Sequence, residues 1–360
     1  MLNRKFRASK SPTFHILTVS SYTAKNDAEK NMKEKISSKL SILPTIIIIL
    51  ISVVLFGGIG IMLLLRFFEK LETENKITWA NLIFPFFILV FIFYSIRYII
   101  INFPKIIVDK SGISFSTYFK KEFYNWNEIE NIQITGKQNL TFLFSTMPIE
   151  ATTLNLKSGK QKYIWADNYS NISEIRILLE KAEKLLSENK TKMNSLDFKI
   201  NRNQKVLNQI NFKDKIEFNG NHFLSANGLM FYGFIIFVLF MFFQNPTKMI
   251  NNYKALLFII TVGTVMCGIF SFKMHYFIIT EKYIIVKNSI WFWHSKIYEI
   301  ENVKELVIES PHKQSTSLRI ITKDYQSKMY QAGSLRDSTW TEMKEYLLKK
   351  GIRIRNETYH

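Results

Sequence analysis

Long runs of apolar residues divide the chain into two kinds of segment. Four runs carry no charged side chain, and each is close to the length that crosses a bilayer as a helix; they lie at 42–65, 77–95, 223–243 and 255–272. Polar stretches follow each pair of runs, and in them short β-branched and aromatic segments alternate with turn residues. This pattern predicts a membrane protein of the α+β class with four transmembrane helices.

The four runs form two pairs, because short connectors at 66–76 and 244–254 join them. Such connectors predict two helical hairpins whose tips lie on one side of the membrane, with the tail and the polar stretches on the other. Nearly all Lys and Arg residues belong to that second side, and positive charge favours the cytoplasm. We therefore expect a multi-pass protein of the cytoplasmic membrane with both termini in the cytoplasm.

An internal repeat organises the polar stretches. The sequence Glu-Ile-Glu-Asn at 128–131 recurs, with Val in place of the following Ile, at 299–302, and the same offset aligns Ile113 with Ile284. The chain therefore contains two copies of one unit, a helical hairpin followed by a polar domain. The predicted organisation is a basic tail at 1–41, a hairpin at 42–103, a domain at 104–190, a linker at 191–222, a hairpin at 223–274 and a domain at 275–356.

Each polar domain is expected to contain short strands followed by one helix. In the first domain the strand-like segments are 105–109, 113–118, 122–126, 132–135, 153–157 and 162–165, and Ser170 is the expected cap of the helix after them. In the second domain the first strand is expected at 276–280 and the last helix near 337–349. The recurring apolar positions should be buried: Ile107, Ile113, Ile129 and Ile132, and their counterparts Ile278, Ile284, Ile300 and Val303.

The start of the first domain resembles a known family. Ile-Val-Asp-Lys-Ser-Gly-Ile at 107–113, followed by Trp-Asn-Glu-Ile at 126–129, is similar to the opening of bacterial pleckstrin-homology-like domains. The resemblance implies a β-barrel or bent sheet that is closed by a C-terminal helix, follows a pair of membrane helices and has no catalytic residues. The second copy departs from the pattern, since Tyr283 stands at the position of Gly112 and Ile297 at that of Trp126.

The sequence lacks the residue patterns that enzymes and metal sites require. Its six histidines are scattered, and its single cysteine, Cys267, lies inside an apolar run. No glycine-rich phosphate-binding loop is present. We therefore expect no enzyme activity, no catalytic or metal-binding residue and no cofactor.

The composition is strongly basic, with 48 Lys and Arg against 29 Asp and Glu and a formal net charge of +19. No nucleic-acid-binding motif accompanies this charge, so nucleic acid is not an expected partner. Two explanations stay open: attraction of the domains to anionic lipid headgroups, or solubility combined with the usual excess of positive charge on the cytoplasmic side. The basic stretch 25–39 is expected to be a helix, either on the membrane surface or in solvent.

One turn differs between the two copies and supplies the candidate site. Lys120 and Lys121 align with Trp291 and Phe292, and Trp293 follows, where the second strand of each domain turns into the third. The aromatic trio either fills the core of its domain or contacts the bilayer interface or a partner, since Trp is favoured at both kinds of surface. The two lysines suit anionic headgroups.

The expected function is that of a non-enzymatic, membrane-anchored scaffold or binding protein. Its two pleckstrin-homology-like domains would contact the lipid bilayer through its headgroups, an unknown protein partner, a second copy in a homo-oligomer, or each other. The alternative is an accessory or immunity component of a membrane export or transport system.

Overall fold

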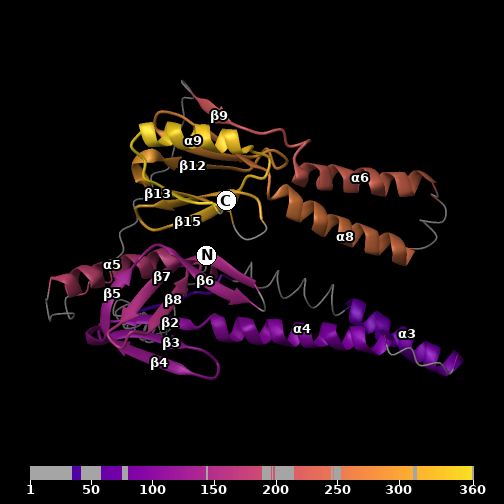
Figure 1. Cartoon of the computed structure of the whole chain (residues 1–360), viewed down its shortest axis with the longest axis horizontal. Coiled ribbons are helices and arrows are strands. Elements are labelled where there is room, and N and C mark those ends of the chain that lie inside the picture. Colours follow the sequence, from indigo (N-terminus) through magenta and orange to yellow (C-terminus); the bar gives the residue numbers. More distant parts are fainter. Residues whose placement is uncertain are drawn as a thin grey trace, which may run out of the picture.

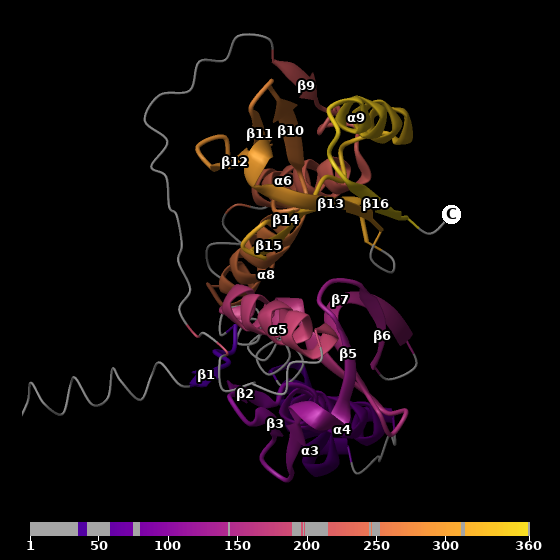
Figure 2. The ribbon, with the colours of Figure 1, turned by 90° about the vertical axis from the view of Figure 1, so that its left-hand side faces the viewer.

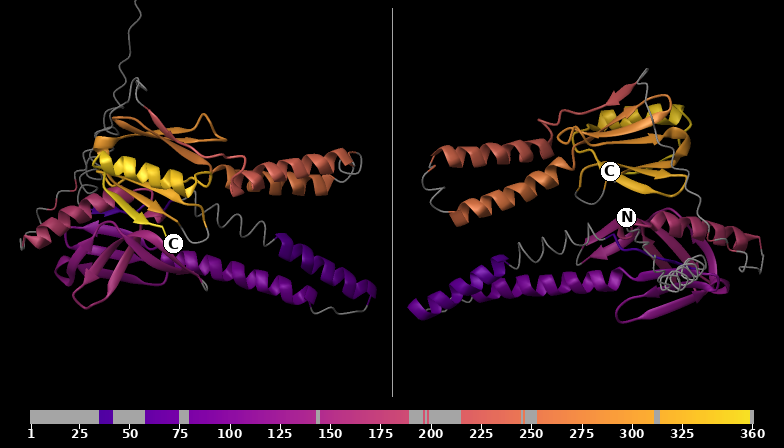
Figure 3. Two further views of the ribbon diagram at one scale, coloured as in Figure 1. Left: turned by 45° about the horizontal axis from the view of Figure 1, so that its top comes forward. Right: turned by 180° about the vertical axis from the view of Figure 1, so that it is seen from behind.

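The computed structural model describes residues 35–41, 58–74, 80–142, 145–188, 196, 198, 215–244, 246, 253–310 and 314–358. Within them the chain has an α+β fold with six α-helices and four sheets. The molecule has two similar halves, each a β-rich domain from which a pair of helices extends, and both pairs leave from the same side (Figures 1 and 3). Most of the expected tail and linker, and residues 42–57 of the first apolar run, lie outside the described residues.

The paired helices are long and apolar in different degrees. Helix α3 packs against α4 in the first half, and α6 packs against α8 in the second. Their bounds are α3 (Gly58–Glu74), α4 (Ala80–Asn102), α6 (Ala226–Gln244) and α8 (Tyr253–Ser271). Pro85 lies inside α4.

The sequence analysis expected four membrane-spanning helices, and the described residues do not contain four. Helix α3 continues past Leu65 into a charged stretch, so only its first part is apolar. The described apolar stretches of α4 and α8 are Pro85–Tyr98 and Ile259–Ser271, which are short for a bilayer. Among the described residues, α6 alone is long and apolar enough to cross a membrane. The expected fold class, a membrane protein with four transmembrane helices in two hairpins, is therefore wrong, because an uncharged run in the sequence is not the same as a helix of that length.

Two sheets and one helix form the first domain. One sheet has the order β1-β2-β3-β4, and the other has the order β5-β7-β6 with β8 also paired to β7; every pairing is antiparallel. Helix α5 (Ile172–Ser187) buries one face in the core between them. The strands are β1 (Lys35–Ser37), β2 (Lys105–Asp109), β3 (Gly112–Ser116), β4 (Lys121–Asn125), β5 (Ile129–Gln133), β6 (Lys137–Phe142), β7 (Ser145–Leu156) and β8 (Gln161–Trp165).

The second domain repeats this plan with one strand added and, among its described strands, no counterpart of β6. Its sheets have the orders β12-β11-β10-β9 and β15-β14-β13-β16, and β16 pairs with β13 in parallel, whereas the other pairings are antiparallel. Helix α9 (Asp337–Lys349) takes the place of α5. The strands are β9 (Ile216–Phe218), β10 (His275–Ile279), β11 (Tyr283–Asn288), β12 (Ser295–Glu299), β13 (Val303–Glu309), β14 (Ser317–Thr322), β15 (Ser327–Gln331) and β16 (Ile354–Glu357).

Each half begins with a strand that precedes its helix pair, which the sequence analysis missed. Strand β1 pairs with β2, and β9 pairs with β10, so the chain leaves each sheet, forms the helices and returns to the same sheet. The repeat therefore starts with a strand before the helices rather than with the helices themselves. The part of the stretch 25–39 that is described contains β1 and not the expected helix, while 25–34 lies outside the described residues.

The recurring apolar positions mostly lie in the two cores, as predicted. Six are buried, at 0–7% exposure: Ile113, Ile129, Ile132, Ile278, Ile284 and Val303. Ile107 and Ile300 are only half-buried, and in the first strand it is the flanking residues Ile106 and Val108 that are fully buried. Ser170 does not cap α5; the N-cap position belongs to Asn171.

Ion pairs join the two domains, which stack on each other (Figure 2). The Arg319 guanidinium on β14 donates to both carboxylate oxygens of Asp167 in the first domain, at 2.7 and 3.0 Å. Arg355 Nη2 on β16 donates to the buried Glu150 carboxylate of the first domain at 2.7 Å. Tyr325, from the turn between β14 and β15, is part of the buried core of the first domain.

Candidate functional site

A turn of the second domain is fixed against the end of α8. It joins β11 to β12, and the side chain of Asn288 accepts hydrogen bonds from the backbone N–H groups at its start, at 2.9 Å. The ring of Trp291 stacks on Phe272, with centroids 6.0 Å apart, and its indole N–H donates to Ser271 Oγ at 2.8 Å. Trp291 therefore links the turn to the residues where the helix ends.

The two residues after Trp291 project from this turn. Phe292 and Trp293 are 76% and 65% exposed, and neither belongs to the buried core of the second domain. Their rings contact each other edge to face, and Trp293 contacts Trp291 in the same way. An exposed cluster of aromatic rings next to an apolar helix is typical of a surface that contacts a membrane or a protein partner.

The equivalent turn of the first domain also exposes aromatic rings. It joins β3 to β4, and Thr117 closes it by backbone and side-chain hydrogen bonds with Lys120. Tyr118 and Phe119 are 87% and 74% exposed, and their rings are 5.2 Å apart. The sequence analysis selected Lys120 and Lys121 here and missed this aromatic pair, although the adjacent Tyr-Phe in a turn was a usable signal.

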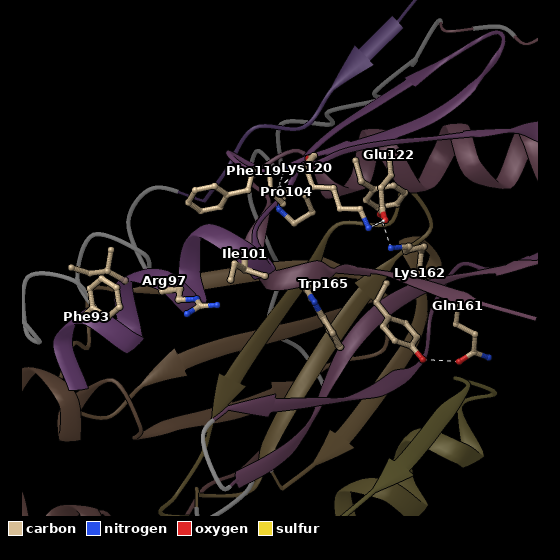
Figure 4. A pocket seen from close by; sticks show the side chains of 14 residues that line it. Phe93, Arg97, Ile101, Pro104, Phe119, Lys120, Glu122, Gln161, Lys162 and Trp165 are labelled. Carbon is tan, nitrogen blue, oxygen red and sulfur yellow. Dashed lines mark hydrogen bonds and ion pairs between the residues drawn. The ribbon is translucent and has the colours of Figure 1, made fainter. Parts of the chain in front are cut away.

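A pocket of about 880 Å³ lies between this turn, the end of α4 and strand β8. Figure 4 shows α4 residues at one end of it and charged residues of β4 and β8 at the other. Its apolar wall consists of Phe93, Ile96, Ile101, Pro104, Phe115, Phe119, Tyr163 and Trp165. The remaining lining residues are polar or charged: Arg97, Thr117, Lys120, Glu122, Gln161 and Lys162. The pocket therefore combines an apolar wall with a charged end.

Ion pairs order the charged end of the pocket. Glu122 accepts from Lys120 and from Lys162, both at 2.6 Å. The hydrogen bonds from these two lysines lower the pKa of Glu122 to about 2, so it is an anion at neutral pH. With Arg97, the pocket has three cations and one anion, and a net charge of +2 follows.

The structure brings together only some of the predicted site residues. Lys120 lines the pocket, and Lys121 begins β4 without lining it. Trp291, Phe292 and Trp293 form one cluster, but this cluster belongs to the other half of the molecule. Whether these five residues contact a membrane or a partner stays a prediction.

Comparison with known proteins gives no relative from which a role could be transferred. No protein-family model matches the chain, and a search of curated proteins finds no match. Within the described stretches, no group of three or more His, Cys, Asp or Glu side chains is placed to hold a metal ion.

Proposed function

We propose that the chain is a non-enzymatic, membrane-attached binding protein. In this proposal its two β-rich domains are pleckstrin-homology-like units that lie at the cytoplasmic face and contact lipid headgroups through their aromatic turns. The cytoplasmic leaflet attracts basic proteins because it carries anionic lipid, and the formal charge of the chain is +19.

The single observation that carries the proposal is the exposed cluster of Phe292 and Trp293 beside the end of α8. An aromatic ring in water at this position is unfavourable, whereas at the headgroup level the ring is buried and the indole N–H stays hydrated. Trp291, fixed to Phe272 and Ser271, holds the two exposed rings in place.

The helices beside these turns support the same proposal. Helix α6 is apolar along its length, and side chains such as Leu229, Ile236 and Phe243 are exposed on it. An apolar surface of this kind is rarely left in water. A bilayer that receives α6 would lie level with the turn next to it, because α6 and α8 extend from the same side of the domain (Figure 1).

Site-specific fluorescence on the full chain tests the proposal. Cys267→Ser gives a cysteine-free background, since Cys267 is the only cysteine. An environment-sensitive dye is then attached through Phe292→Cys, and through Glu281→Cys as the control. Glu281 lies in the turn between β10 and β11, at the opposite end of the strand pair from α8.

We expect reconstitution into liposomes to shift the emission of the dye at position 292 to shorter wavelength and to protect it from aqueous iodide. The dye at position 281 should stay accessible, because about six residues of strand separate it from the membrane surface, roughly 20 Å. Equal accessibility of both dyes in liposomes would refute the proposed contact.

A further inference from the structure

The pocket of the first domain has the dimensions and the lining of a binding site for one amphiphilic molecule. Its volume of about 880 Å³ lies within the usual range for small-molecule sites, roughly 300–1,000 Å³. Eight of its lining residues are apolar or aromatic, and four are charged. A wholly polar ligand would leave the greater part of this wall without a matching surface.

The charges select an anion. Lys120 and Lys162 already share Glu122, but Arg97 takes part in no ion pair with any described residue, and the net charge of the pocket is +2. Arg97 extends from α4 toward the middle of the pocket, where Trp165 lies (Figure 4). A guanidinium is well suited to a phosphate group, because its N–H donors form a planar fork.

The apolar wall continues out of the pocket along α4. Phe93 is 69% exposed, and Ile96 and Ile101 on the same helix are also exposed. A hydrocarbon chain can therefore leave the pocket over the surface of α4 while its charged headgroup stays at Arg97 and Lys120. Free phosphate or a sugar phosphate would make no use of this path.

The second domain has no equivalent of the charged end. At the repeat offset, Gly268 stands where Arg97 is, and Trp291 where Lys120 is. The ring of Trp291 stacks on Phe272, just after the end of α8. At these two positions the second domain therefore lacks the cations that line the pocket of the first.

We infer that this pocket binds one anionic phospholipid, with the phosphate between Arg97 and Lys120 and an acyl chain along α4. The inference rests on the proposed function, since the bilayer is the source of the lipid. It adds that one lipid molecule is held at a defined site, in addition to the general contact between the turns and the headgroups.

Native mass spectrometry of the full chain in a non-ionic detergent tests the inference. The probes are phosphatidylglycerol and phosphatidylcholine with identical acyl chains, and glycerophosphate and inorganic phosphate as headgroup fragments. We expect phosphatidylglycerol to saturate at one molecule per chain, with weaker binding of phosphatidylcholine and no binding of the fragments. Comparable binding by the fragments would overturn a lipid site in favour of a soluble phosphate site.

Two arginine variants form the matched comparison. Arg97→Gln removes the pocket cation that has no ion pair with a described residue, and Arg66→Gln removes an exposed arginine on α3 that does not line the pocket. Loss of a charge-assisted hydrogen bond should weaken phosphatidylglycerol binding roughly 10- to 100-fold in Arg97→Gln. Binding should be unchanged in Arg66→Gln, and equal weakening in both variants would overturn the site.

Glu122→Gln provides a test with the opposite sign. It raises the net charge of the pocket to +3 and frees both lysines, so phosphatidylglycerol should bind several-fold more tightly; weaker binding in a folded variant would contradict the assignment.

The dye experiment keeps the two proposals distinguishable. If the dye at position 292 reports membrane contact and Arg97→Gln has no effect, only the lipid pocket fails; if the dye stays in water while Arg97 remains essential for lipid binding, the contact of the turn fails instead.

Discussion

The Arg319–Asp167 pair joins the two domains through two hydrogen bonds, and we expect Arg319→Met to loosen the contact between them. Arg319 is 2% exposed, and it donates to Asp167 through two nitrogens and to Glu309 Oε1 through Nε at 3.0 Å. Methionine has similar length and fills the space without any charge. The change thus removes the pairing and leaves the packing nearly intact.

The contacts of Arg319 and Asp167 determine how much stability each variant should lose. Breaking a buried ion pair usually costs about 3–5 kcal/mol, because the remaining partner keeps a buried charge. Here Glu309 retains Lys137, whose Nζ lies 2.8 Å from its carboxylate, so the cost should be near the lower limit, about 3 kcal/mol. Asp167→Asn should cost less, about 1.5–3 kcal/mol, since Asp167 is 48% exposed and Arg319 keeps Glu309.

Hydrogen exchange on the full chain in detergent measures both changes locally. A loss of about 3 kcal/mol corresponds to an opening equilibrium roughly 100-fold larger in the strands that surround Arg319. The double variant Arg319→Met/Asp167→Asn completes a cycle whose coupling energy belongs to the contact between the domains. Lys323→Met is the control, because Lys323 is an exposed cation directly after β14.

The coupling energy decides the outcome. If the effects of the two single changes simply add, the Arg319–Asp167 pair does not stabilise the contact between the domains, and Arg319 acts only through Glu309 inside its own domain. Exchange that rises equally in Lys323→Met would show that charge on β14, rather than the pairing, is responsible.

Two further predictions concern the individual domains. Ile132→Ala should lower the free energy of unfolding of the first domain by about 2–5 kcal/mol, because Ile132 is 2% exposed within its core. Denaturant unfolding monitored by amide hydrogen exchange in β5 measures this change. An unchanged unfolding midpoint would contradict the core position of Ile132. Burial lowers the pKa of His275 below its ordinary 6.5, so the folded domain resists protonation while the unfolded chain accepts it. The stability that comes from neutral His275 is present above pH 6.5 and is lost as the pH falls below it. The melting temperature should therefore be lower at pH 5 than at pH 7.5, and this difference should be smaller in His275→Asn.

Much of the β structure could be predicted from the sequence. The expected strand 105–109 coincides with β2, and the expected last helix coincides with α9. Both predictions rest on a pattern that is repeated in the chain, so each copy supports the other. The fixed spacing from Ile113 to Ile132, and from Ile284 to Val303, likewise located residues that lie in the cores.

Other features could not be predicted from the sequence, for physical reasons. Strands β1 and β9 have three residues each, which is too short for an alternating pattern, and their partners are far away in the sequence. The prediction of four membrane-spanning helices was wrong because the absence of charge in a run does not determine where a helix starts. Helix α3, for example, carries charged residues in its second part. Nor does the sequence show the pocket, since Arg97, Lys120 and Lys162 meet only when β8 and β4 come together at the end of α4.

The two halves use the same position in the fold in different ways, and this is the argument for separate roles. In both, the turn between the last two strands of the first sheet, β3–β4 or β11–β12, lies beside the end of a helix and exposes two aromatic rings. In the second half Trp291 stacks on Phe272 and donates to Ser271, and the rings of Phe292 and Trp293 stay exposed. In the first half the pocket beside the turn is open and ends in charged residues, so it can also hold a ligand. If both halves served only to attach the protein to a membrane, there would be no reason for the two turns to differ in this way. The difference is expected if one half attaches the protein and the other binds a lipid selectively.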